Sequence, residues 1–250
     1  MTAVSKSKRF AQFAVLAMIT GEISYLAAEV LVLRSVGPSA RRYTAGQRLP
    51  DNATFTLRPG DTVVVLSGAG TRTLRGPGTC NASGAGCTGR LASGQVRVGT
   101  GATRTGPVGA PEPVPTDVWQ VNVTQNGRAC VTAGGSPVLW RPNAERAVEL
   151  TITPQTGAAQ TVTWARGQST LAWPASVPVV DGASYQLNWT GGSSPTRLTV
   201  KSLQPAAAGD RFGLATALIG ANCLGQLDTF NAVHDVDTAR AATTGTTGAQ

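Results

Sequence analysis

Four cysteines are the residues of this 250-residue chain whose chemistry is easiest to assign. Cys80 and Cys87 flank a glycine-rich segment, whereas Cys130 and Cys223 lie far apart. There is no CxxC spacing and the chain has 1 histidine, so a zinc site would lack ligands. In a chain that leaves the cytoplasm, an even number of cysteines favours two disulfides, which three pairings could satisfy. We expect Cys80–Cys87, because a short flexible loop closes easily, and this leaves Cys130–Cys223.

Catalytic combinations are poorly supported. A nucleophile–histidine–carboxylate triad would have to use His234 with its neighbours Asp235 and Asp237, at the point where a helix is ending, and a solvated terminus explains these residues better. Paired carboxylates for glycoside hydrolysis could come from Glu145, Glu149 and Asp181, but nothing brings two of them together across a cleft. We therefore expect no enzyme, no cofactor and no metal, and keep a hydrolase as the second alternative.

Arginine is unevenly distributed along the chain. Residues 29–110 hold ten arginines against three acidic residues, a net charge of +7, whereas residues 111–250 carry −1. Such a basic half could attract an anionic partner. We take Arg41, Arg42, Arg72 and Arg75 as the first candidates for a contact surface. The expected partner is an envelope protein or an anionic surface polymer; nucleic acid is not expected.

All five tryptophans fall after residue 118. In sugar-binding β-sandwiches, exposed aromatic rings offer flat apolar faces to the sugar. Trp140 precedes Arg141-Pro142 and Trp173 precedes Pro174, so both stand at strand ends and are the best candidates for such a platform. The competing interpretation places all five in the core of alternating strands. A carbohydrate-binding module is the first alternative function.

The N-terminus has the order of a secretory signal peptide. Lys6, Lys8 and Arg9 precede an apolar run of about ten residues, Phe10–Ile19, and a more polar stretch that ends in small residues. The run is shorter than the roughly 20 residues that span a bilayer. We expect cleavage after Ala28, with a cut one residue earlier or an uncleaved anchor as alternatives. The mature protein would then be periplasmic or secreted, with no transmembrane span.

The rest of the chain predicts a mainly β fold. Few charged residues (14%), 30 glycines and 15 prolines favour short strands and many turns. Residues 29–98 predict a small Arg-rich β-meander, 99–117 a Gly/Pro linker, and 118–203 an immunoglobulin-like β-sandwich. Strands are expected at 29–36, 55–57, 62–66 and 71–74, then at 118–124, 129–132, 137–141, 148–153, 160–165, 169–173, 184–189 and 196–202.

A C-terminal helix is predicted over 209–234. Asp210 is a suitable N-cap, and apolar residues recur on one face at helical spacing. Three glycines weaken this helix, so we expect it to lean on the sandwich, pinned there by Cys223. Residues 238–250 are low in hydrophobicity and predict a disordered tail.

Several segments carry a resemblance to known proteins. The segments Arg34–Ala40 (RSVGPSA), Gly60-Asp61 before a strand, and Arg72–Gly78 (RTLRGPG) are similar to those of small uncharacterised exported bacterial proteins, as are Leu139–Pro142 and Leu171–Pro174. The resemblance covers most of the mature chain and implies an envelope protein, with no catalytic residues. At fold level, residues 29–98 also resemble the β-repeat domains of envelope signalling regulators. The sequence as a whole predicts an exported, non-enzymatic interaction protein.

Overall fold

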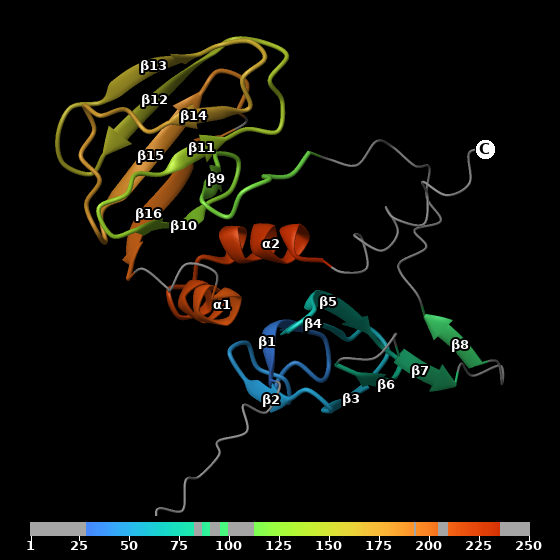
Figure 1. Cartoon of the computed structure of the whole chain (residues 1–250). Coiled ribbons are helices and arrows are strands. Elements are labelled where there is room, and N and C mark those ends of the chain that lie inside the picture. The colour runs from blue at the N-terminus through green and yellow to red at the C-terminus, as the bar shows by residue number, and fades with distance from the viewer. Residues whose placement is uncertain are drawn as a thin grey trace, which may run out of the picture.

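The structure is a computed structural model that describes residues 29–82, 87–90, 96–99, 113–192, 194–204 and 210–235 (Figure 1). The predicted signal peptide, most of the predicted linker and the predicted tail lie outside the described residues.

The N-terminal unit consists of two four-stranded sheets, ordered β2-β1-β4-β5 and β3-β6-β7-β8. Its strands are β1 (Glu29–Val36), β2 (Arg48–Pro50), β3 (Thr54–Leu57), β4 (Thr62–Ser67), β5 (Gly70–Arg75), β6 (Gly78–Asn81), β7 (Cys87–Arg90) and β8 (Val96–Gly99). All strand pairs within these sheets are antiparallel. The four strands predicted for this region are confirmed, and the other four were not foreseen.

Strands β1 and β4 are apolar on both faces. Val30, Val32 and Phe55 belong to the core between the two sheets. Leu31 and Leu66 belong to a different core, on the opposite face. The uninterrupted runs of aliphatic residues in these strands are therefore the pattern of a sheet that is covered on both sides.

The C-terminal unit is a β-sandwich with sheets ordered β10-β16-β15-β12-β13 and β14-β11-β9. Its strands are β9 (Gln120–Asn122), β10 (Gly127–Thr132), β11 (Val138–Trp140), β12 (Val148–Pro154), β13 (Gln160–Trp164), β14 (Thr170–Ala172), β15 (Ser184–Trp189) and β16 (Thr196–Leu203). All eight predicted strands are present. The pairs β9–β11 and β10–β16 are parallel. The mainly β class is thus confirmed, while the immunoglobulin-like detail stays a prediction.

The predicted single helix is two helices. Helix α1 (Arg211–Gly220) has Asp210 as its N-cap, as expected, with the carboxylate accepting a hydrogen bond from the Gly213 N–H at 3.0 Å. Helix α2 (Leu224–Val233) follows after a break at residues 221–223, where Asn222 adopts φ 57°. Asparagine is among the few residues that tolerate this left-handed conformation, so it can end one helix and turn the chain into the next. Neither helix has the length and apolar content to cross a bilayer in the described part of the chain.

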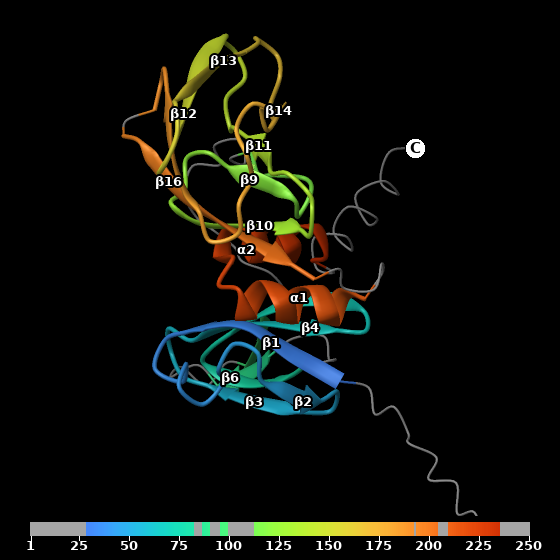
Figure 2. The ribbon, with the colours of Figure 1, turned by 90° about the vertical axis from the view of Figure 1, so that its left-hand side faces the viewer.

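The two helices form a layer between the two β units. Figure 2 shows α1 against the sheet of β1 and β4, and α2 beneath β10. One buried cluster joins these elements, with members from every layer: Leu31, Leu66, Cys130, Leu218, Leu227 and Phe230. The helices therefore lean on both units, and the C-terminal segment of the chain holds the N-terminal unit against the sandwich.

Candidate functional site

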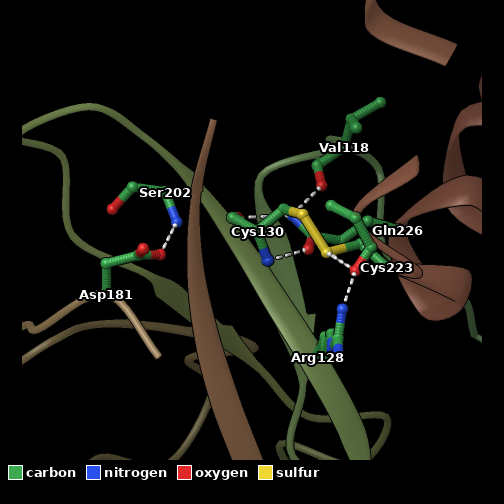
Figure 3. The surroundings of a disulfide bond; sticks show 8 residues. Val118, Arg128, Cys130, Asp181, Ser202, Cys223 and Gln226 are labelled. Carbon is green, nitrogen blue, oxygen red and sulfur yellow. Dashed lines mark hydrogen bonds between the residues drawn. A yellow bond between two sulfur atoms is a disulfide. The ribbon is translucent and has the colours of Figure 1, made fainter. Parts of the chain in front are cut away.

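Both expected disulfides are present. Cys80 is bonded to Cys87, and Cys130 is bonded to Cys223. Cys130 lies in edge strand β10, and Cys223 immediately precedes α2, so the second bond ties the sandwich to the helix layer (Figure 3). Both of its cysteines are fully buried, which marks it as a structural bond.

Gln226 completes this junction. Its side chain is 2% exposed, and its amide nitrogen donates to the carbonyl oxygens of Val118 and Cys130, each at 2.9 Å. Its amide oxygen accepts from the Cys130 N–H. The amide therefore occupies both outward backbone groups of Cys130, as a neighbouring strand would, and satisfies the open edge of β10.

Asp61 fastens three loops at one end of the N-terminal unit. Its buried carboxylate accepts from the backbone N–H groups of Ser39, at 2.8 Å, and Arg58. Its carbonyl oxygen accepts from the Gly76 N–H at 3.0 Å. Desolvation pushes the pKa of Asp61 upward, but the hydrogen bonds from Ser39 and Arg58 and the Arg58 charge outweigh it and hold the pKa below its ordinary value.

Two glycines permit this close approach. At Gly37, which has φ +109°, an added Cβ would lie 2.6 Å from an Asp61 carboxylate oxygen. At Gly76 an added Cβ would lie 2.1 Å from the Arg58 carbonyl oxygen. The glycine-proline pairs that carry the resemblance noted above therefore have a structural cause, because the three loops can meet only where side chains are missing.

Three of the four predicted contact arginines lie on these loops or directly beside them, Arg75 as the last residue of β5. Arg41 and Arg42 follow Ser39, Arg75 precedes Gly76, and all three are exposed. Arg58, which was not among the predicted contact residues, is also exposed, and its backbone N–H donates to the same Asp61 carboxylate. We name Arg41, Arg42, Arg58 and Arg75 the arginine loop cluster. Among the described residues, the ion pairs of this unit are instead Arg34–Asp228 and Arg48–Glu29.

Arg72 is not part of this surface, and its assignment as a contact residue is corrected. It is 8% exposed, and it pairs with Val65 across the β4–β5 ladder while Leu74 pairs with Val63. Residues paired in this way share a face, so the Arg72 side chain points toward the core between the two sheets. It is therefore a buried residue of the scaffold.

Trp140 and Trp173 lie in the core, as the competing interpretation held, and the exposed tryptophan platform is wrong. Trp140 is 4% exposed and Trp173 is 7% exposed. The Trp173 indole N–H donates to the Val177 carbonyl at 2.9 Å, and its ring packs edge-on against Tyr185 with centroids 5.0 Å apart. A ring held in this way cannot present a flat face to a sugar. Neither Trp140 nor Trp173 therefore offers an exposed ring in this structure.

His234 has a local role at the end of α2. Its Nδ1 lies 2.8 Å from the Phe230 carbonyl oxygen, and its ring stacks on Phe230 with centroids 4.3 Å apart. Glu145 and Glu149 are both exposed. No group of three metal-binding side chains occurs among the described residues. That these residues take no part in catalysis stays a prediction.

Apart from the arginine loop cluster, a concave surface lies where α2 meets the sandwich. It is a cavity of about 370 Å³ between α2, the β9–β10 loop and residues 113–115. Sequence analysis did not foresee it, since its walls come from segments far apart in the chain. The candidate binding regions among the described residues are thus the arginine loop cluster and this groove.

Comparison of the chain with protein-family models, with curated proteins and with solved structures finds no match. Functional inference therefore depends on the geometry of these two surfaces.

Proposed function

We propose that this chain is an exported, non-catalytic binding protein of the cell envelope, and that the arginine loop cluster is its contact surface for an anionic partner. The partner is an acidic face of an envelope protein or an anionic surface polymer. The observation that carries the proposal is that Arg41, Arg42, Arg58 and Arg75 are exposed on three loops that Asp61 fastens together.

Preorganisation supports a binding role for these loops. An arginine on a free loop loses backbone freedom when it binds, at a cost of roughly 1–2 kcal/mol for each residue that becomes ordered. Here the backbone of each loop is already held by hydrogen bonds to Asp61. A partner would therefore meet four positive charges whose supporting backbone is already fixed, which favours affinity.

Export is supported by the redox chemistry of the chain. Both pairs of cysteines are bonded, and disulfides of this structural kind persist in oxidising compartments. The predicted signal peptide points to the same compartments. A periplasmic or secreted location would bring the arginine loop cluster into contact with the anionic polymers and proteins of the envelope.

Ion-exchange binding to a defined polyanion tests the surface. Mature protein would be loaded on immobilised poly-L-glutamate and eluted with a salt gradient, because exposed charge interactions weaken as salt screens them. The Arg41→Glu/Arg75→Glu variant is expected to elute at clearly lower salt than wild type. The control, Arg146→Glu/Arg166→Glu, makes the same change in net charge at two exposed positions of the sandwich. It is expected to elute close to wild type, and equal shifts for both variants would show that net charge alone governs binding and would defeat the proposal.

A further inference from the structure

The groove beside α2 is separate from the arginine loop cluster and has a different chemistry. Its volume of about 370 Å³ lies inside the range of about 300–1,000 Å³ that is usual for small-ligand sites. The residues that carry the argument below are Gln120, Asn122, Asn126, Val114, Leu224 and Gly225.

Three side-chain amides line the groove with their oxygens already occupied. Gln120 accepts from the Thr116 N–H at 3.0 Å. Asn122 accepts from the Thr124 N–H at 2.9 Å, and Asn126 accepts from the Arg197 N–H at 2.7 Å. Because each oxygen is fixed, each NH₂ group is held in one orientation, and none of the three has an acceptor among the described residues. Each of these lining side chains therefore has an NH₂ group that is left over to donate to a ligand in the groove.

The groove is lined by one side chain of each charge, Arg128 and Asp228, and each already has a partner. Arg128 donates to the Ala221 carbonyl at 2.9 Å (Figure 3), and Asp228 pairs with Arg34 at 2.7 Å. Because these two charges are opposite in sign, the lining favours neither an anionic nor a cationic ligand. An uncharged ligand that is rich in hydrogen-bond acceptors fits this lining best.

Two aliphatic side chains give the groove an apolar side. Val114 is 57% exposed and Leu224, in α2, is 53% exposed, and both line the groove. These are large exposed fractions for apolar residues. Contact with a ligand methyl group would stabilise the complex by about 25 cal/mol for each Å² of apolar surface removed from water. The ligand should thus combine carbonyl acceptors with small apolar groups.

We propose that the groove binds an N-acetylated polysaccharide. Each N-acetyl group carries a carbonyl oxygen for an amide NH₂ and a methyl group for Val114 or Leu224, and the sugar hydroxyls supply further acceptors without charge. This chemistry is found in the glycan strands of a bacterial envelope. It does not require Trp140 or Trp173, which are buried, nor the arginine loop cluster.

Gly225 provides a way to block the groove without disturbing the fold. It lies in the exposed first turn of α2, and an added Cβ would approach only the end of the flexible Gln125 side chain, at 3.0 Å. Gly225→Gln should place a side chain in the groove and raise helix propensity. Gly220→Gln is the control, because an added Cβ there meets nothing within 4 Å and Gly220 does not line the groove.

A second set of variants removes the donors and keeps the scaffold. Asn122→Asp and Asn126→Asp retain the oxygens that accept from Thr124 and Arg197, but replace each NH₂ with a carboxylate oxygen. The loops should stay in place, while a carbonyl acceptor on the ligand would face a repelling oxygen. Loss of binding in these variants would therefore report on the donors rather than on folding.

Saturation-transfer NMR with tetra-N-acetylchitotetraose on the mature protein tests the proposal, with cellotetraose as the ligand control because it has the same linkage and no acetamido groups. We expect saturation of the acetyl methyl protons and no signal from cellotetraose. Binding should be at least about tenfold weaker in Gly225→Gln and in Asn122→Asp/Asn126→Asp, and unchanged in Gly220→Gln. Equal binding of both sugars, no binding at millimolar concentration, or unchanged binding in Gly225→Gln would overturn it. So would Gly225-dependent binding of an uncharged blocked tripeptide, acetyl-trialanine amide, in place of the sugar.

Discussion

Replacement of Gln226 by methionine tests the junction between the two β units. Methionine has a similar length and a similar helix propensity, so packing and helix terms change little. What the substitution removes is the side-chain amide, with its bonds to Val118 and to both outward backbone groups of Cys130. The disulfide between Cys130 and Cys223 is left intact.

The expected cost follows from these three bonds. A buried hydrogen bond contributes about 0.5–1.5 kcal/mol net, so three give about 2–4 kcal/mol. Water cannot readily replace the amide, since Cys130 is fully buried and Gln226 is 2% exposed. Because domains are stable by about 5–15 kcal/mol, the variant should fold but with a clearly smaller free energy of unfolding.

Guanidinium unfolding followed by tryptophan fluorescence would measure this loss, under oxidising conditions that keep both disulfides. Gln186→Met, at an exposed position of β15, is the matched control and should change stability by less than about 0.5 kcal/mol. A loss below about 1 kcal/mol for Gln226→Met would refute the reasoning, because the edge of β10 would then be satisfied without the amide.

Three further predictions concern the other supports of the fold. In the chain-entropy model, loss of the Cys130–Cys223 bond, which closes a separation of 93 residues, should lower the free energy of unfolding by about 4–5 kcal/mol, and loss of Cys80–Cys87, with a separation of 7, by about 2 kcal/mol. Chemical denaturation of the two double-serine variants compares these losses, and the reverse order would contradict the model. Arg141 is fully buried and donates to the carbonyls of Ala165 and Gln168, so Arg141→Ala should lower the free energy of unfolding by about 2–4 kcal/mol and make the 165–168 loop sensitive to limited proteolysis. A protease pattern like that of wild type would argue against this anchoring. Because the folded pKa of Asp61 lies below its unfolded value, Asp61 stabilises the fold at neutral pH and loses this contribution as the pH falls through the folded pKa. The difference in free energy of unfolding between wild type and Asp61→Asn should therefore narrow below about pH 4, and a difference that does not depend on pH would count against the role of the carboxylate.

Periodicity predicted the sandwich well. Strands such as β12, β13 and β15 alternate more and less buried residues, and turn signals such as Asn126-Gly127 and Asp181-Gly182 separate the strands. The disulfide pairing was also predictable, because a seven-residue loop closes easily and only one other pair remained. Local rules were sufficient for these features.

Features that depend on layers were harder to predict. Arg72 and Leu74 are two residues apart in one strand, so their side chains lie on the same face of the sheet. This spacing could have excluded Arg72 from the predicted contact surface. Trp140 and Trp173 stand at strand ends, but their burial depends on which layer covers those ends. The helix break at Asn222 and the groove beside α2 depend on contacts between distant segments, which local sequence patterns do not specify.

Crosslinking in intact cells tests the central claim most directly. Tagged wild type, Arg41→Glu/Arg75→Glu and Arg146→Glu/Arg166→Glu would be crosslinked, and the bound material identified by mass spectrometry together with the mature N-terminus. The account predicts a mature chain that starts near Glu29, and one dominant envelope partner or anionic polymer that is lost only in Arg41→Glu/Arg75→Glu. A full-length chain crosslinked to cytoplasmic proteins, or an envelope partner retained equally by all three proteins, would contradict it.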